Sequence, residues 1–250
     1  MLKKRIIPCL DIQNGQTVKG IQFKEIKEVG DPVKLAQRYI QEGADEIVFL
    51  DITATIEKRQ TLIDLVKRLA KEINIPFTIG GGIKKLEDAR LLLQSGADKV
   101  SLNSAAVKRP KLITQIAKVF GSQSVVVAID TKYIDGQWYV YTSGGRTPTN
   151  IKTIDWAKQA EALGAGEILL TSMNNDGTKN GFAIDIVEAV NQAVNIPVIA
   201  SGGAGKKEDF KDLFKKTETS AALAASIFHY QEVNIDELKP YLKNQQIAVR

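Results

Sequence analysis

The chain repeats part of its own sequence after 121 residues, and this repeat constrains the fold more than any other feature. The segment Glu-Gly-Ala-Asp-Glu-Ile from Glu42 resembles Leu-Gly-Ala-Gly-Glu-Ile from Leu163. The segment Asn-Ile-Pro-Phe-Thr-Ile-Gly-Gly-Gly-Ile from Asn74 resembles Asn-Ile-Pro-Val-Ile-Ala-Ser-Gly-Gly-Ala from Asn195. Because both pairs have the same spacing, we expect two halves of similar structure related by an approximate twofold axis.

Short β-branched segments alternate with amphipathic ones along both halves. Eight strands and eight helices in alternation predict a single α/β domain over residues 1–250, a closed parallel (β/α)8 TIM barrel with half-barrels at about 1–122 and 123–250. Two half-size open sheets are the alternative, although no linker-like change in composition divides the chain. The expected strands are Arg5–Asp11, Glu46–Asp51, Phe77–Ile79, Lys99–Asn103, Ser124–Asp130, Glu167–Thr171, Val198–Ser201 and Ala221–Ala225. The expected helices are Pro32–Glu42, Lys58–Ile73, Lys84–Ser95, Pro110–Phe120, Ile151–Leu163, Ala183–Val194, Lys206–Lys216 and Ile235–Lys243, with a hairpin in Tyr133–Thr149.

Composition excludes several classes of protein. Hydrophobic residues make up 44% and charged residues 25%, so extensive disorder is not expected. No apolar run is long enough for a transmembrane helix, and none near the N-terminus is long enough for a signal peptide, so we expect a cytoplasmic protein. The net charge of +5 comes without an arginine-rich segment interleaved with aromatics, so neither nucleic acid nor membrane is an expected partner.

One cysteine, Cys9, and one histidine, His229, limit the available chemistry. They cannot form a disulfide framework or a metal site with several cysteine or histidine ligands. Cys9 lies in an apolar strand-like run, where a buried side chain is the simplest interpretation. Carboxylates are therefore the better candidates for proton transfer.

Aspartates end the first and fifth expected strands, at Asp11 and Asp130. The active site of such a barrel lies at the carboxyl ends of its strands, and strands one and five are opposite each other. The two candidate catalytic carboxylates would therefore face each other across a substrate, which suits a proton donor on one side and an acceptor on the other. Asp51, at the end of the second strand, is a further candidate for substrate binding. A strand-end aspartate can also simply cap the next turn.

Glycine-rich turns follow the third and seventh expected strands. Backbone N–H groups and a helix N-terminus together bind phosphate well. Because the turn occurs twice, we expect a substrate with a phosphate at each end, although glycines that only permit tight turns are the alternative. The candidate residues are Gly81, Gly82, Asn103 and Ser104 on one side, and Ser201, Gly202, Gly203, Ala225 and Ser226 on the other.

Two more segments are candidates for substrate contact. The stretch from Gln13 to Gly30 is long, polar and contains glycine, so we expect a mobile lid from which Lys19 reaches a phosphate. Thr171 ends the sixth strand, and Asp176 and Gly177 follow it, where we expect them to contact the substrate.

Charged residues begin four strands at the opposite end of the expected barrel. They are Arg5, Glu46, Lys99 and Glu167. Charges at strand starts usually only solvate the rim. Two of each sign could instead form a ring of ion pairs around the bottom opening.

The motifs Arg5–Asp11, Phe49–Ala54, Gly80–Ile83, Val126–Asp130, Asp176–Lys179 and Ala200–Gly205 carry a family resemblance over nearly the whole chain. On these motifs the chain closely resembles the cyclase subunits of imidazole glycerol phosphate synthase, from histidine biosynthesis. The resemblance implies a lyase in a heterodimer with a glutaminase subunit, which docks on the N-terminal face of the barrel. Ammonia would pass through the barrel, with the four charged residues as its gate.

At the other face, the resemblance implies a reaction of ammonia with the bis-phosphorylated phosphoribulosyl-formimino aminoimidazole carboxamide ribotide. The products would be imidazole glycerol phosphate and aminoimidazole carboxamide ribotide, without a metal or organic cofactor. Asp11 and Asp130 match the acid–base pair of the family. Asp11 would act on ammonia addition and imine chemistry, and Asp130 on elimination and ring closure.

Three other functions stay open. A paralogous ammonia-using barrel of sugar-modification pathways is disfavoured by the two aspartates and the two phosphate sites. The sister isomerase of the same pathway is disfavoured by the four gate charges and by Asp176-Gly177-Thr178. A non-catalytic scaffold that only activates a glutaminase predicts partner binding without turnover of free ammonium. Asn174, Asn175 and Ala183 depart from the charged groups of many relatives, which leaves the substrate contacts after the sixth strand open.

Overall fold

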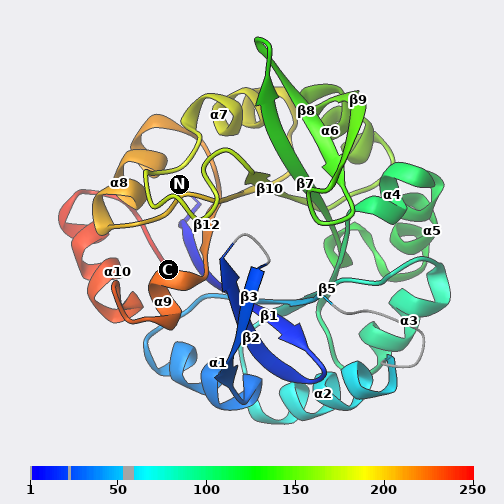
Figure 1. Cartoon of the computed structure of the whole chain (residues 1–250), viewed down its shortest axis with the longest axis horizontal. Coiled ribbons are helices and arrows are strands. Elements are labelled where there is room, and N and C mark those ends of the chain that lie inside the picture. The colour runs from blue at the N-terminus through cyan, green and yellow to red at the C-terminus, as the bar shows by residue number, and fades with distance from the viewer. Residues whose placement is uncertain (1, 22–23, 53–58) are drawn as a thin grey trace.

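The structure is a computed structural model that describes residues 2–21, 24–52 and 59–250 (Figure 1). Thr53 and Ala54 of the second motif, and Lys58 at the expected start of a helix, lie outside these residues. The strands are β1 (Arg5–Gln13), β2 (Gln16–Ile21), β3 (Lys24–Gly30), β4 (Ile47–Asp51), β5 (Phe77–Gly80), β6 (Lys99–Leu102), β7 (Val125–Ile134), β8 (Gln137–Thr142), β9 (Thr147–Lys152), β10 (Glu167–Ser172), β11 (Val198–Ser201) and β12 (Ala221–Ala224). The helices are α1 (Pro32–Gln41), α2 (Arg59–Glu72), α3 (Leu86–Gln94), α4 (Ser104–Lys108), α5 (Lys111–Phe120), α6 (Thr153–Ala162), α7 (Ile184–Ala193), α8 (Lys207–Lys216), α9 (Ser226–His229) and α10 (Ile235–Asn244), with a 3-10 turn at Ser122–Ser124.

Eight of these strands close into a parallel barrel surrounded by helices (Figure 1). Their order around the barrel is β1, β4, β5, β6, β7, β10, β11 and β12. The parallel pairing of β12 with β1, Ala221 opposite Arg5, closes the ring. This arrangement confirms the predicted (β/α)8 barrel and excludes two open sheets. The half-barrel boundary near residue 122 stays a prediction.

Apolar side chains fill two layers of the molecule. The larger layer lies between strands and helices and includes Ile6 and Leu10, which are fully buried. Successive side chains of a strand point to opposite faces, so Ile7 belongs instead to the layer inside the barrel. That inner layer separates the two ends of the barrel with apolar side chains, and it includes the buried Cys9 as expected. Its members are Ile7, Cys9, Val48, Val126, Leu169, Ile199, Ala221 and Leu223.

The internal repeat is preserved in how two helices begin. Asp88 accepts hydrogen bonds from the two backbone N–H groups before α3, at 2.8 and 3.2 Å. Asp209, which lies 121 residues later in the sequence, accepts the two equivalent bonds before α8, at 2.8 and 3.0 Å. A carboxylate in the first turn satisfies N–H groups that a helix cannot satisfy internally. The same local sequence therefore orients both helices against their strands.

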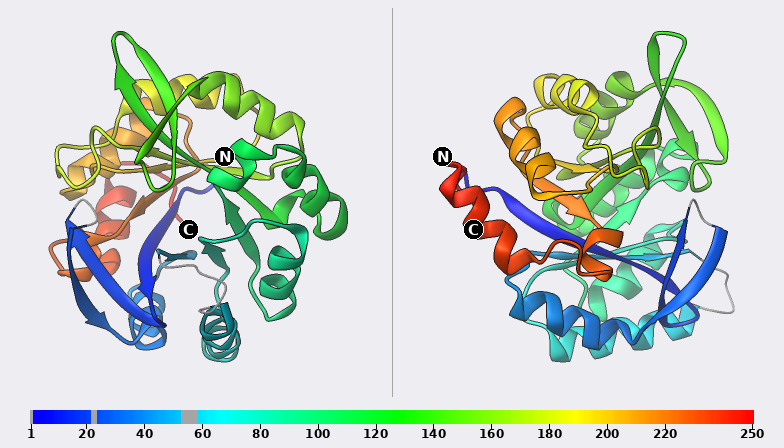
Figure 2. Two further views of the ribbon diagram at one scale, coloured as in Figure 1. Left: turned by 45° about the vertical axis from the view of Figure 1, so that its right-hand side comes forward. Right: turned by 60° about the vertical axis from the view of Figure 1, so that its left-hand side comes forward.

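The segment expected to form a lid is a β-hairpin. β1 continues to Gln13, and Asn14 and Gly15 take positive φ values of 52° and 79°, which suit a tight hairpin turn. β2 then pairs antiparallel with both β1 and β3. The two termini lie at one end of the barrel, and the β2–β3 and β7–β8 hairpins lie at the other (Figure 2). Motion of this lid stays a prediction. The expected contact of Lys19 with a phosphate also stays a prediction, because its side chain lies outside the part of the chain that the structure describes.

Some element boundaries differ from the expected ones. The strand expected from Ser124 begins one residue later, because Ser124 belongs to the 3-10 turn. The helix expected from Ile151 begins at Thr153, because β9 extends to Lys152 as the third strand of the β7–β8 hairpin sheet. The short helices α4 and α9 were not expected at all. Both begin directly after a barrel strand, so they change the candidate site.

Candidate active site

Asp11 and Asp130 lie at the carboxyl ends of opposite strands. Three strands separate β1 from β7 in either direction around the barrel. Asp11 lies opposite Leu50 of β4, and Asp130 lies opposite Thr171 of β10. Both side chains are half-buried. The structure therefore brings the two candidate carboxylates to one end of the barrel, on opposite sides of its mouth, with Thr171 beside Asp130.

The carboxyl group of Asp130 binds a proton more tightly than an ordinary aspartate. Burial raises the pKa of Asp130 from 3.8 to about 6, and the negative charge of Asp176 adds to this increase. A hydrogen bond from Asn103 Nδ2 to Asp130 Oδ2, at 2.9 Å, acts in the opposite direction because it stabilises the carboxylate. A carboxyl with a raised pKa can donate or accept a proton closer to neutral pH than an ordinary aspartate can.

The first glycine turn lies against the end of a neighbouring strand. Gly81 has a φ of 97°, and a Cβ at this position would lie 2.1 Å from the backbone oxygen of Asp51. Only glycine permits this approach. Asn103 precedes α4, whose first-turn N–H groups cannot be satisfied within the helix. Because β5 pairs with β6, the candidate group of Gly81, Gly82, Asn103 and Ser104 is assembled along one edge of the mouth.

The second glycine turn repeats this geometry on the other half. Gly202 and Gly203 have φ values of 90° and 105°, and Ser201 before them is buried. Ala225, which precedes α9, has φ −124° and ψ −77°, close to the −125° and −99° of Asn103. Since β11 pairs with β12, the group of Ser201, Gly202, Gly203, Ala225 and Ser226 is also assembled along one edge.

The remaining substrate candidates differ in their surroundings. Asp51 is buried at the end of β4. Asp176 and Gly177 are exposed in the loop after β10, where the Asp176 N–H donates to the carbonyl of Ser172 at 2.9 Å. Asp176 still lies close enough to Asp130 to raise its pKa. These residues border the mouth, and their contacts with substrate stay predictions.

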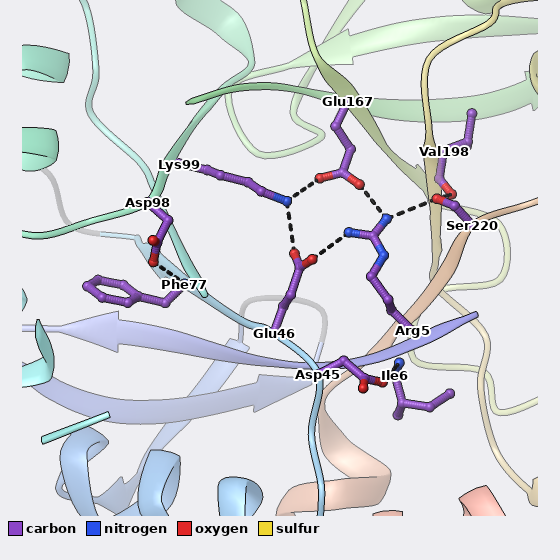
Figure 3. Close-up of polar contacts among 10 residues, drawn as sticks. All are labelled: Arg5, Ile6, Asp45, Glu46, Phe77, Asp98, Lys99, Glu167, Val198 and Ser220. Carbon is purple, nitrogen blue, oxygen red and sulfur yellow. Dashed lines mark hydrogen bonds and ion pairs between the residues drawn. The ribbon is translucent and has the colours of Figure 1, made fainter. Parts of the chain in front are cut away.

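At the opposite end of the barrel, four charged side chains form a closed ring (Figure 3). Arg5 contacts Glu46 at 2.6 Å and Glu167 at 2.5 Å. Lys99 contacts the second oxygen of each of the same carboxylates, at 3.0 and 2.8 Å. The side chains of the arginine and of both glutamates are at most 8% exposed, whereas that of Lys99 is 17% exposed. The ring therefore covers the inner apolar layer at the N-terminal end.

The ring keeps its buried charges ionised. Burial alone would raise the pKa of Glu46, but the charges of Arg5 and Lys99 outweigh it and lower that pKa below its ordinary value. Burial likewise works against the charge of Arg5, and the carboxylates of Glu167 and Glu46 outweigh it and raise the pKa of Arg5. Ser220 Oγ accepts a further hydrogen bond from Arg5 Nη2 at 3.0 Å. Ser220 is not among the residues predicted from the sequence, although the repeat offers a signal, since Ser220 lies 121 residues after Lys99.

Comparison with known proteins assigns this barrel to a family. A family model described as "Histidine biosynthesis protein" matches residues 5–234. The chain therefore belongs to this family of histidine-biosynthesis proteins. Among its relatives, "Imidazole glycerol phosphate synthase subunit HisF" from Hydrogenobaculum sp. (strain Y04AAS1) is 61% identical over 251 residues. The proteins of the same name from Flavobacterium psychrophilum and Elusimicrobium minutum are 59% and 60% identical over 250 residues, and each match covers the whole of both chains.

Among residues 2–21, 24–52 and 59–250, no helix is both long and apolar enough to cross a membrane. Within the same part of the chain, no three histidine, cysteine, aspartate or glutamate side chains gather as metal ligands would.

Proposed function

We propose that the chain is the cyclase subunit of imidazole glycerol phosphate synthase and acts as a lyase in histidine biosynthesis. It would use ammonia to convert phosphoribulosyl-formimino aminoimidazole carboxamide ribotide to imidazole glycerol phosphate and aminoimidazole carboxamide ribotide. One observation carries the proposal: two half-buried aspartates lie on opposite sides of the barrel mouth, between two glycine turns. Each half of the mouth holds one of these turns beside a short helix. Such a mouth suits a substrate with a phosphate at each end. The names of the full-length relatives support the same activity.

The two aspartates would divide the proton transfers. Asp11 would assist addition of ammonia and the following imine chemistry, and Asp130 would assist elimination and closure of the imidazole ring. A pKa of about 6 supports this role for Asp130, because the same carboxyl can release a proton in one step and accept it in another. The substrate phosphates would bind at the two glycine turns and hold the reacting atoms between the carboxyls.

Ammonia would reach this site through the barrel from a glutaminase subunit docked at the N-terminal face. The inner layer is apolar, so it favours neutral ammonia over the ammonium ion. The ring of Arg5, Glu46, Lys99 and Glu167 would be the gate at the entrance, and its opening requires ion pairs to separate. The heterodimer would work in the cytoplasm, with no nucleic acid or membrane as a partner and without a cofactor.

Turnover by the purified chain alone tests the proposal. The bis-phosphorylated substrate and an ammonium salt at alkaline pH should give products, followed as loss of substrate absorbance. Asp11→Asn and Asp130→Asn should each lower this rate by at least about 100-fold, because each removes a proton-transfer group. Asp135→Asn, at the exposed tip of the β7–β8 hairpin, is the matched control and should retain the wild-type rate.

Measuring glutaminase binding together with turnover distinguishes a catalytic subunit from a non-catalytic scaffold. Both aspartate variants should bind the glutaminase subunit as the wild type does, because the ring lies at the other end of the barrel. Wild-type-like turnover in either variant refutes the assignment of that aspartate. A wild-type chain that binds the glutaminase but never consumes substrate with free ammonium would support the scaffold function instead.

A further inference from the structure

The side chain of Asn175 ties together the two ends of the loop between β10 and α7. Its Oδ1 accepts a hydrogen bond from Ser172 Oγ at 2.9 Å, and its Nδ2 donates to the carbonyl of Gly181 at 2.8 Å. Because a carbonyl oxygen can only accept, the amide nitrogen must face Gly181, which fixes the orientation of the amide. One neutral side chain therefore joins the end of β10 to the residues before α7.

The backbone that Asn175 holds lies directly against the second glycine turn. The Gly181 N–H donates to the carbonyl of Gly203 at 2.8 Å. A Cβ on Gly203 would lie 2.1 Å from the carbonyl oxygen of Gly181 and 2.9 Å from the Cβ of Asn175. A Cβ on Gly202 would lie 2.7 Å from the carbonyl oxygen of Ser172. Both glycines thus pack against the backbone of Ser172 and Gly181, the two residues that the Asn175 amide connects through the Ser172 hydroxyl and the Gly181 carbonyl.

The local turn does not need this amide. The N–H and the hydroxyl of Thr178 both donate to the backbone carbonyl of Asn175, at 3.0 and 2.7 Å. These bonds close the turn from residue 175 to residue 178 without any Asn175 side-chain atom. The two bonds of the side chain instead run to Ser172 and Gly181, which are the supports of the glycine turn. The side chain therefore fixes how the loop after β10 packs against the Gly202-Gly203 turn.

We propose that Asn175 is a positioning residue for the substrate phosphate at the Gly202-Gly203 turn. This inference rests on the proposed function, since it takes that turn to be a phosphate site. Phosphate binding by backbone N–H groups depends on their exact directions, which the Ser172–Asn175–Gly181 bridge maintains. An uncharged amide does so without repelling the anion. An aspartate at this position would lose the donor to Gly181 and place a negative charge beside the phosphate.

Steady-state kinetics of the full-length chain with ammonium test this role. Asn175→Ala should raise KM for the bis-phosphorylated substrate about tenfold, equivalent to about 1.4 kcal/mol, and leave kcat within about twofold, since the carboxyls are untouched. Asn175→Asp should raise KM further, and added salt should reduce the difference between the two variants. Asn180→Ala, an exposed asparagine in the same loop, is the matched control and should keep the wild-type KM.

A second measurement separates this inference from the proposed function. In amide NMR spectra, titration with inorganic phosphate should shift the Gly203 resonance in the wild type and require about tenfold more phosphate in Asn175→Ala. Unchanged KM and an unchanged phosphate titration in Asn175→Ala would overturn the inference, as would a loss of kcat at constant KM. Absence of any turnover by the wild type would instead overturn the proposed function. In that case the Gly203 titration would still show whether Asn175 positions the turn for phosphate binding.

Discussion

The two ends of the barrel shift the pKa of a carboxyl group in opposite directions. At the N-terminal end, Glu46 lies between the charges of Arg5 and Lys99, which lower its pKa. At the C-terminal end, Asp130 has a neutral donor in Asn103 and a negative neighbour in Asp176, and its pKa rises to about 6. The same barrel therefore keeps one carboxylate charged at neutral pH and leaves the other able to exchange a proton.

The two carboxyl groups suit different roles: Glu46 suits structural stability, and Asp130 suits proton transfer. A carboxylate with two cationic partners stabilises the ring of ion pairs. It cannot transfer protons near neutral pH, because its protonation would leave buried cations uncompensated. A carboxyl without a cation destabilises the fold when it ionises, and in return it titrates where an acid–base catalyst is useful. The inner apolar layer keeps the two environments apart.

Breaking the ring should give the largest effect on stability. Glu167→Ala leaves both Arg5 and Lys99 with one carboxylate between them, so we expect the free energy of unfolding to fall by about 3–5 kcal/mol in denaturant titrations. Glu232→Ala is the control, because its pair with Lys179 is 38–44% exposed and should contribute less than about 1 kcal/mol. Equal decreases in the free energy of unfolding of the two variants would show that the ring stabilises the fold no more than an exposed ion pair does.

Removing the charge of Asp130, which has no ion-pair partner among the described residues, should stabilise the protein. The pKa of Asp130 is about 6 when folded and 3.8 ordinarily, so the wild type loses stability as pH rises between these values. Asp130→Asn should therefore be more stable than wild type by about 1–2 kcal/mol at pH 8, after allowance for solvent screening. The advantage should disappear below about pH 4. A difference independent of pH in urea titrations would speak against the raised pKa.

The amide of Asn103 should tune the proton affinity of Asp130. Its hydrogen bond lowers the pKa of Asp130, so Asn103→Ala should move the limb of the pH–rate profile near pH 6 upward by about one unit. Turnover has to be compared at a constant concentration of unprotonated ammonia. A limb that stays in place would mean that Asn103 does not act through Asp130.

The hydroxyl of Ser220 should have the smallest effect. Ser220→Ala removes one hydrogen bond to Arg5 but leaves both ion pairs of Arg5, so the free energy of unfolding should fall by only about 1 kcal/mol. Ser220→Thr, which keeps the hydroxyl, should restore most of it. A loss as large as that of Glu167→Ala would show that the ring depends on its serine as much as on its charges.

The sequence predicted the barrel because the barrel elements carry local signals. Asp31 caps α1 and Pro32 begins it, as their order in the sequence indicates. The β2–β3 hairpin was missed because Lys24–Gly30 is rich in charged residues, which have weak strand propensity. Its strands form because β1 extends past the barrel and provides a partner, and that is a tertiary effect.

The candidate site was predictable where strand order alone determines position. Asp11 and Asp130 follow from the ends of opposite strands, and the glycine turns follow from the repeat. The Asn103 bond to Asp130 and the Asn175 bridge depend on how loops fold back on strands, which no periodicity encodes. The raised pKa of Asp130 likewise depends on burial and on Asp176, a residue in another loop.

Carboxyl carbon NMR of the 13C-labelled chain, titrated from pH 3 to pH 9, tests the contrast between the two ends most directly. We expect Asp130 to titrate with a midpoint of about 6 and Glu46 to titrate below its ordinary 4.5. An Asp130 midpoint near 3.8, or a Glu46 midpoint above 4.5, would contradict this contrast.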